Sequence, residues 1–184
     1  MVAISIAALF FTSCVGAPLP PTYVTPAQSG WSTSCSDGWR VTGYYTPREE
    51  EFTGPSTQID VPGHGFVKFP LDFVRHVQVE GWGLTRYGWY LGWEQGWTKD
   101  DAPRDSRGER LRNGSLAVDP SVIPFGTRVQ IPNLPPPWDE QSFIAADTGG
   151  AIEGKHVDVY CGAGPAALRE AIRITANNRR VCSS

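Results

Sequence analysis

The segment 143–162 constrains the fold of this chain most, because it sets two β-type runs around a glycine-rich turn: F-I-A-A-D-T-G-G-A-I-E-G-K-H-V-D-V-Y-C-G. The run 143–146 is apolar and typical of a buried strand. The run 156–160 alternates strictly, so Asp158 shares one face with polar neighbours while valines occupy the other. Asp147 ends the first run. The pattern therefore predicts a β-rich domain in which two carboxyl groups lie on or beside strands.

The rest of the chain also favours short strands and many turns over a helical bundle. It contains 16 prolines and 20 glycines, and few of its apolar stretches are long and periodic. Further strands are expected at 39–46, 116–118 and 127–131, with a last one near 173–175 or 180–182. Gly164-Pro165 should begin a helix that docks on the sheet through Leu168 and Ile172, which are four residues apart. Short strands with one docked helix predict a small closed barrel.

The segment 48–112 gives the weakest pattern. F-V-K-F-P-L-D-F-V suggests a strand or a short helix, and 99–112 is charged and expected to be solvated. Between them lie aromatic residues interleaved with glycines: Trp82, Tyr87, Trp89, Tyr90, Trp93 and Trp97. Such rings fill a core more often than they stack on sugars, although their faces suit the apolar faces of pyranoses. We place an inserted aromatic-rich segment at about 64–112.

Size and charge exclude some classes of protein. The chain of 184 residues is long enough for one domain with a sizeable core. Its net charge is −3 and it has no basic run, so no nucleic-acid partner is expected. There is no C-x-x-C motif and there are no paired histidines, so no metal site is expected.

The N-terminal residues are typical of an export segment. Residues 2–11 are uncharged and mostly apolar, but too few to span a bilayer. They end in Phe11-Thr12-Ser13-Cys14, which resembles a lipobox and predicts a membrane anchor on lipidated Cys14. The alternative is an ordinary secretory signal cut nearby. We assign 1–14 to a signal peptide, 15–36 to a linker rich in Pro, Ser and Thr, and 37–184 to the domain.

Cysteine usage agrees with export to an oxidising compartment. If Cys14 is acylated, Cys35, Cys161 and Cys182 remain. One disulfide is expected among these three, with one thiol left free. The sequence does not choose among the three pairings.

Three ordered motifs carry a family resemblance: A-V-D-P-S-V-I-P-F-G-T (117–127), A-D-T-G-G-A-I-E-G (146–154) and H-V-D-V-Y-C-G (156–162). Together they resemble the 3D family, named for three aspartates, which includes the MltA-type lytic transglycosylases of bacterial cell walls. A shorter run, T-G-Y-Y-T-P (42–47), is similar to the first barrel strand of that group. The resemblance covers 113–184 most strongly and implies a six-stranded double-psi β-barrel, a topology that periodicity alone does not give.

The resemblance also implies a function and a mechanism. The substrate would be the glycan strands of peptidoglycan, cleaved at the β-1,4 bond between N-acetylmuramic acid (MurNAc) and N-acetylglucosamine (GlcNAc). Asp158 would protonate the glycosidic oxygen and then take the proton of the C6 hydroxyl, which gives a 1,6-anhydro product. Hydrolytic glycosidases normally need two carboxylates, whereas this reaction needs one. The resemblance also implies that no metal or organic cofactor takes part.

Each aspartate has a plain alternative role. Asp158 would gain a raised pKa in a dry groove, or it could be an exposed strand residue paired with Lys155 or Arg173. Asp147 could keep Asp158 protonated by like-charge repulsion, or it could simply accept amide hydrogen bonds in the turn that follows it. Asp119 precedes a proline, so it either forms a turn or lines the groove.

Five further residues are candidates for binding substrate. The Gly149-Gly150 turn, with Thr148 before it, offers backbone amides that a ligand can approach closely. Tyr44 and Tyr45 alternate faces, so one of them should reach the groove, and Tyr45 is our candidate. His156 is the fifth, because it shares a strand face with Asp158.

The chain departs from the family in one respect. MltA-type enzymes carry a second, larger domain that helps to form the glycan groove, and here only about fifty residues, 64–112, are available for that role. Two other functions therefore stay open. One is a non-catalytic module that binds cell-wall polysaccharide, comparable to expansin-type barrels, and the other is a glycoside hydrolase that uses two of the aspartates.

Overall fold

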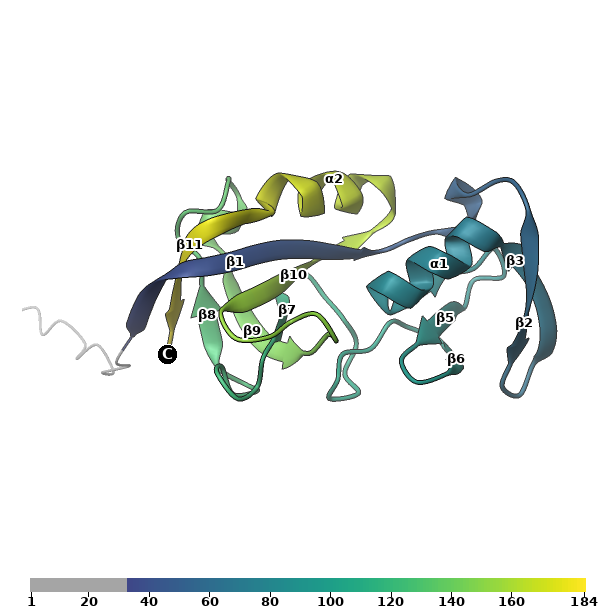
Figure 1. Cartoon of the computed structure of the whole chain (residues 1–184), viewed down its shortest axis with the longest axis horizontal. Helices are drawn as coiled ribbons and strands as arrows, with labels where there is room; N and C mark the ends of the chain where they lie inside the picture. The colour runs from purple at the N-terminus through teal and green to yellow at the C-terminus, as the bar shows by residue number, and fades with distance from the viewer. Residues whose placement is uncertain (1–32) are drawn as a thin grey trace, which may run out of the picture. The chain divides into compact units, whose positions relative to one another are not determined.

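The computed structural model describes residues 33–184, which contain a closed six-stranded barrel (Figure 1). Around the barrel the order is β1 (Ser34–Thr46), β10 (His156–Ala163), β7 (Ser115–Val118), β9 (Ser142–Asp147), β8 (Arg128–Gln130) and β11 (Ala176–Ser183). β1 runs parallel to β10 and β7 parallel to β9, whereas the other neighbours are antiparallel. The mainly β fold and the double-psi barrel expected from the sequence are confirmed.

Every second side chain of β10 points into the barrel interior. Val157 and Val159 are fully buried and lie opposite Val118 and Leu116 of β7, which are also fully buried. Asp158 therefore projects from the other face of the same strand.

Helix α2 (Gly164–Ile174) begins at the predicted Gly164-Pro165 and packs on β1 (Figure 1). Leu168 packs against the barrel core as predicted, whereas the prediction that Ile172 docks the helix was wrong, because Ile172 is 68% exposed. Ala167, Ala171 and Ile174 are the buried residues of this helix that face the barrel. The helix lies so close to the strand at Ala171 that Gly43 of β1 has no room for a side chain, because an added Cβ would come within 2.6 Å of the Ala171 Cα.

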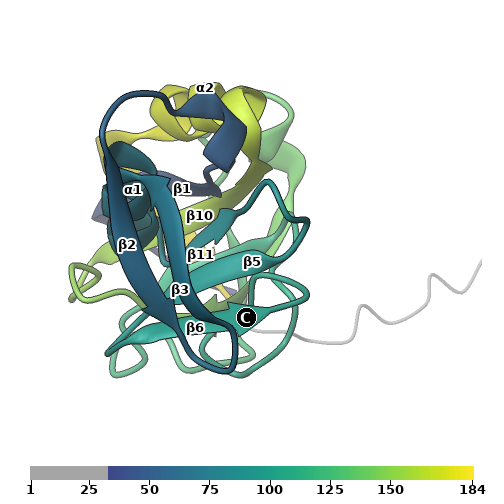
Figure 2. The ribbon, with the colours of Figure 1, turned by 90° about the vertical axis from the view of Figure 1, so that its right-hand side faces the viewer.

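The barrel is interrupted between β1 and β7 by residues 47–114, which we call the insert. This segment begins earlier than the expected 64–112. Its elements are η1 (Glu49–Glu51), β2 (Ser56–Val61), β3 (Gly65–Pro70), α1 (Leu71–Glu80), β4 (Trp82–Leu84), β5 (Tyr90–Trp93) and β6 (Trp97–Asp100). Figure 2 looks onto the β2–β3 hairpin and the β4–β5–β6 sheet.

The insert has its own hydrophobic core. Phe69, Phe73, Val77 and Leu91 are fully buried in it, and three of the tryptophans pack against them: Trp89, Trp93 and Trp97. The motif F-V-K-F-P-L-D-F-V forms both a strand, β3, and the start of a helix, α1. With Trp82, which packs against a neighbouring cluster, four of the six aromatic residues of the predicted segment thus pack against a hydrophobic core.

A disulfide joins Cys35 of β1 to Cys182 of β11, and Cys161 is a buried free thiol. The predicted signal peptide, the lipobox cysteine Cys14 and most of the linker lie outside the described residues, while Ser34–Ser36 belong to β1. No helix within 33–184 has the length and hydrophobicity to cross a membrane.

Candidate active site

A cavity of about 590 Å³ lies where the barrel meets the insert, and we call it the cleft. This volume is within the range of small-molecule binding sites. The barrel contributes Tyr44, Ala117, Asp147 and Asp158, and the turn after β9 contributes Thr148, Gly149, Gly150 and Ile152. The insert contributes Gln78, Val79, Glu80, Gly81, Trp82, Trp93, Glu94, Thr98, Arg104, Asp105 and Ser106.

Asp158 faces the cleft from the middle of β10, beside Thr42 of β1. Its Oδ1 atom is buried and has no hydrogen-bond partner among the described residues. Burial raises the pKa of Asp158 to about 6, and the charge of Asp147 adds to the rise, while the Thr42 hydroxyl and the Arg40 charge oppose it. A carboxyl group in this state retains its proton in part near neutral pH, as a general acid must.

Asp147 lies at the end of β9, and its carboxylate accepts four hydrogen bonds. Oδ2 accepts from the Tyr44 hydroxyl at 2.7 Å. Oδ1 accepts from the backbone N–H and the hydroxyl of Ser106, at 3.0 and 2.7 Å, and from the Thr148 N–H at 2.9 Å. Asp147 thus fastens the loop 101–114 to the barrel while its charge acts on Asp158.

Asp119 does not line the cleft. Its Oδ1 accepts from the Ser121 N–H at 2.9 Å and from the Ser121 hydroxyl at 2.6 Å, and its Oδ2 accepts from the Gly154 N–H at 2.8 Å. The Ser121 hydroxyl, followed by the Gly154 N–H, lowers the pKa of Asp119. Asp119 therefore connects the turn after β7 to the loop before β10.

The structure separates the predicted substrate-binding residues into two groups. Thr148, Gly149 and Gly150 line the cleft. Tyr45 is 2% exposed and packs in the barrel core, and His156 is buried, with its Nδ1 3.0 Å from the Ala151 carbonyl oxygen and its Nε2 3.0 Å from the Thr42 hydroxyl.

Tyr44, the alternative to Tyr45, is the tyrosine that reaches the cleft. Thr42 lies opposite Asp158 in the parallel pair, and Tyr44 is two residues further on, so the three side chains share a face. Burial, together with the charge of Asp147, raises the pKa of Tyr44 well above its usual value. The register of β1 against β10 was the missing information, because alternation alone does not say which tyrosine faces the cleft.

Glu80, the last residue of α1, is a cleft carboxyl group that the sequence did not indicate. Its Oε2 accepts a hydrogen bond from the Tyr45 backbone N–H at 3.1 Å. Burial raises the pKa of Glu80 to about 7, with a further rise from the charge of Asp158 and an opposing effect of the Tyr45 N–H. The cleft thus holds two carboxyl groups that bind protons more tightly than usual.

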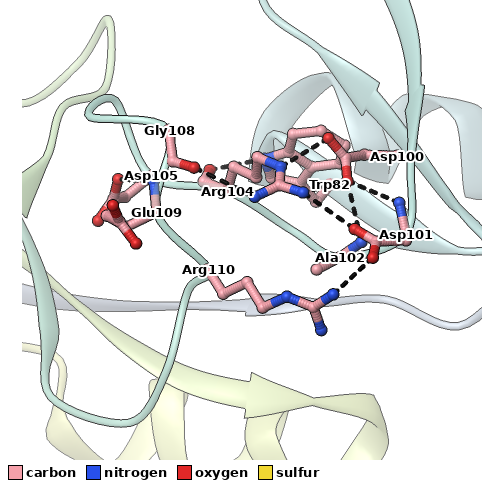
Figure 3. A network of polar contacts seen from close by, with 9 residues as sticks. All are labelled: Trp82, Asp100, Asp101, Ala102, Arg104, Asp105, Gly108, Glu109 and Arg110. Atoms are coloured by element: carbon pink, nitrogen blue, oxygen red, sulfur yellow. Dashed lines mark hydrogen bonds and ion pairs between the residues drawn. The ribbon is translucent and has the colours of Figure 1, made fainter.

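The loop that carries Ser106 is held by polar contacts rather than solvated throughout (Figure 3). Arg104 pairs with Asp100, with Nε 2.6 Å from Oδ2, and with Asp101, with Nη2 2.9 Å from Oδ1. The Trp82 indole N–H donates to the Arg104 carbonyl at 2.9 Å. Asp105 is buried, and its Oδ1 accepts from two backbone N–H groups of the loop. These contacts fix the loop so that Ser106 can bind Asp147.

Residues 114–177, which contain Asp119, Asp147 and Asp158, match the family model of the 3D domain. Solved structures with the same fold are MltA-type lytic transglycosylases, and the resemblance seen in the sequence is confirmed. No curated protein matches the chain in sequence.

Two solved structures illustrate the likeness. Escherichia coli MltA with bound chitohexaose is 16% identical, with 79% of this chain and 71% of that chain covered and a TM-score of 0.59. The membrane-bound lytic murein transglycosylase of Agrobacterium tumefaciens is 15% identical, with 79% and 73% covered and a TM-score of 0.56. At this identity the likeness establishes the fold.

Proposed function

We propose that this protein is a lytic transglycosylase that cleaves peptidoglycan between MurNAc and GlcNAc, with Asp158 as the acid and then the base. The observation that carries the proposal is the state of the Asp158 carboxyl group. It faces the cleft, one oxygen has no partner among the described residues, and burial raises its pKa to about 6. The 3D domain and the fold shared with MltA-type enzymes support the same function.

The reaction needs one proton that moves in two directions. Protonated Asp158 donates its proton to the glycosidic oxygen, the bond from that oxygen to C1 of MurNAc breaks, and GlcNAc leaves with a hydroxyl group. Ionised Asp158 then accepts the proton of the MurNAc C6 hydroxyl, whose oxygen bonds to C1 and closes the 1,6-anhydro ring. Asp158 is protonated again at the end, so the cycle consumes no water and needs no second reactant.

The walls of the cleft suit a glycan strand as the partner. Trp82, Trp93 and the largely exposed Val79 offer apolar surface beside the polar turn at Thr148–Gly150. The structure of Escherichia coli MltA, which holds chitohexaose, supports glycan binding at this fold. The disulfide supports an exported protein, and the lipid anchor on Cys14 stays a prediction.

Product analysis tests the proposal. The purified protein is incubated with peptidoglycan sacculi, and mass spectrometry of the soluble products is expected to show anhydro-muropeptides. Asp158→Asn should lower their release by about 10²-fold or more, the usual loss when a general acid is removed. Asp60→Asn is the matched control, because Asp60 is exposed on β2, away from the cleft. Absence of anhydro products, or full activity in D158N, would contradict the proposal.

A glycoside hydrolase is the second candidate, because Glu80 gives the cleft a second carboxyl group with a raised pKa. Two carboxyl groups across a glycosidic bond allow hydrolysis. Products with reducing ends in place of anhydro ends would identify this reaction. Retention of the protein on sacculi without any released product would instead favour a binding module.

A further inference from the structure

His156 is a buried histidine on the same strand as Asp158, and both of its ring nitrogens have partners. Nδ1 is 3.0 Å from the Ala151 carbonyl oxygen, and Nε2 is 3.0 Å from the Thr42 hydroxyl oxygen. A carbonyl oxygen only accepts hydrogen bonds, so Nδ1 must carry the ring proton. Burial lowers the pKa of His156, the Ala151 carbonyl opposes this effect, and the charge of Arg40 adds to it. The ring is therefore neutral near pH 7, and its Nε2 atom carries no proton.

The bare Nε2 atom fixes the direction of the Thr42 hydroxyl group. In a neutral ring an unprotonated nitrogen can only accept, so Thr42 donates its single hydroxyl proton to His156. This proton is then not available to any other acceptor. Two neutral side chains on neighbouring strands are thus locked together beside the cleft.

Thr42 is also the direct neighbour of Asp158 across the parallel pair of β1 and β10. Neighbouring strands lie about 4.8 Å apart, and the two side chains leave the same face, so they are within reach of each other. A hydroxyl that donates to a carboxylate stabilises the ionised form, and in this direction Thr42 opposes the raised pKa of Asp158. A hydroxyl whose proton is held by His156 offers Asp158 only its lone pairs. The buried Oδ1 atom of Asp158, which has no hydrogen-bond partner among residues 33–184, agrees with this arrangement.

We propose that His156 is a positioning residue, which holds the Thr42 hydroxyl proton away from Asp158 and so withholds a hydrogen bond that would stabilise the ionised acid. The inference rests on the proposed function, since it is the protonated form of Asp158 that starts the reaction. His156 touches neither the substrate nor the reacting atoms. It acts through Thr42, and its effect depends on the Thr42 hydroxyl.

Other titratable groups lie around Asp158 and His156 and are the same in every variant below: Arg40 and Tyr44 of β1, Glu80 of α1, Asp147 of β9, Lys155 before β10 and Cys161 within it. Burial raises the pKa values of the Tyr44 phenol and the Cys161 thiol, so both are uncharged at neutral pH. The Lys155 Nζ donates to the Asp37 carbonyl at 2.9 Å. A comparison of variants at His156 and Thr42 therefore isolates the hydroxyl proton.

The position of the ring proton is tested first. In protein labelled with ¹⁵N in the imidazole rings, NMR distinguishes a protonated ring nitrogen from a bare one. The chain has three histidines, and the His156 signals are assigned by their loss in a His156 variant. The neutral ring should carry its proton on Nδ1. A proton on Nε2 would overturn the proposal, because Thr42 would then accept from His156 and keep its own proton for Asp158.

Two substitutions at His156 separate its two contacts. His156→Asn keeps an amide that can donate to the Ala151 carbonyl but leaves Thr42 without its acceptor, whereas His156→Gln places an amide oxygen where Nε2 accepts. The Asp158 carboxyl carbon is followed by ¹³C NMR against pH, with its signal assigned by its loss in D158N. H156N should lower the midpoint by about 0.5–1 pH unit, because two or three donated hydrogen bonds together lower a carboxyl pKa by about two units. H156Q should stay closer to the wild type, and the exposed His64→Asn should change nothing. An unchanged midpoint in H156N overturns the proposal.

Thr42→Val gives an independent answer, also where a His156 variant fails to fold. If the hydroxyl proton belongs to His156, its removal should leave the Asp158 midpoint near that of the wild type. The double variant T42V/H156N should then have the midpoint of T42V, since the effect of His156 passes through Thr42. A clear rise in T42V would show that Thr42 already donates to Asp158 in the wild type, which contradicts the proposal.

Activity links the hydrogen bond to the reaction. A general acid loses activity as the pH rises through its pKa. On sacculi, the alkaline decline of anhydro-muropeptide release in H156N should therefore move to lower pH by the shift seen in NMR, with activity retained on the acid side. A wild-type protein without anhydro products would refute the proposed function and leave the titrations to decide on His156. An active wild type whose pH profile is identical to that of H156N would refute the role of His156 alone.

Discussion

The Asp158 carboxyl group is buried in the cleft at a cost to the stability of the fold. Its pKa in the folded protein is about 6, against about 4 for an unperturbed aspartate. Between these values the folded protein holds a proton that the unfolded chain releases, so the free energy of unfolding falls as the pH rises. At a pH above both pKa values the destabilisation by the buried carboxylate is complete, and at a pH below both it vanishes.

Asp158→Asn should therefore stabilise the protein in a pH-dependent way. At pH 8 the variant is expected to gain on the order of 2 kcal/mol in the free energy of unfolding, and the gain should disappear by about pH 3. Urea denaturation at several pH values measures this difference. Asp60→Asn should show no such trend, since Asp60 is exposed on β2. A variant that is less stable than the wild type at alkaline pH would show that Asp158 is not destabilising.

Asp119 should behave as a structural residue. Asp119→Ala removes three hydrogen bonds, two from Ser121 and one from Gly154. The melting temperature should fall, while product release per folded molecule stays near the wild-type rate. Because the pKa of Asp119 is lowered, its contribution is present above its usual pKa and is lost as the pH falls, so the deficit should shrink in acid. Lost activity with unchanged melting would place Asp119 in the chemistry instead.

The motifs predicted part of the site at the level of single residues. Asp147 ends one β-type run and Asp158 interrupts another, and both line the cleft in the structure. Glu80 could not be found in this way, because a glutamate at the end of an amphipathic helix has the pattern of a solvated charge. Its burial depends on β1, which lies thirty-five residues earlier in the chain and supplies the Tyr45 N–H.

Among the elements, β1 and α2 are in contact so close that no carbon atom can be added at Gly43. An added Cβ at Gly43 would lie 2.6 Å from the Ala171 Cα and 3.0 Å from the Ala171 Cβ, so strand and helix would have to separate. Gly43→Ala should cost about 1–3 kcal/mol in the free energy of unfolding, the usual cost of overpacking. Chemical denaturation measures the loss. Gly96→Ala is the control, since nothing lies within 4 Å of its added Cβ, and equal stability of the two variants would contradict the argument.

The contact between β1 and α2 also shows what can be predicted from the sequence and what cannot. Most barrel strands contain alternating or apolar runs, so their positions follow from the pattern, whereas β11 (A-N-N-R-R-V-C-S) has neither. The orientation of α2 does not follow from the pattern, because Ala171 and Ile174, and not Ile172, lie against Gly43. In the insert, strands of three or four residues such as β4 and β5 are too short to show a period.

At the scale of the whole described unit, the cleft exists because the insert is fastened to the barrel at separate points. The Tyr45 N–H holds Glu80, and Asp147 holds Ser106. The Leu84 N–H donates to the Pro47 carbonyl at 2.8 Å, close to where the insert begins. The compact insert thus supplies one wall of the cleft, a role that the sequence left open.

The Cys35–Cys182 disulfide should stabilise this assembly as a whole. The two cysteines are opposite each other in the antiparallel pair of β1 and β11 and are 147 residues apart, so the bond encloses both the barrel and the insert. A cross-link over so long a loop restricts the unfolded chain strongly, and the double variant Cys35→Ser/Cys182→Ser should lose about 2–4 kcal/mol in the free energy of unfolding. Urea denaturation with and without reductant measures it: reductant should destabilise the wild type and leave the double variant unchanged, because the remaining described cysteine, Cys161, is a free thiol. Equal stability of the reduced and oxidised wild type would mean that the ladder between β1 and β11 closes the barrel without the bond.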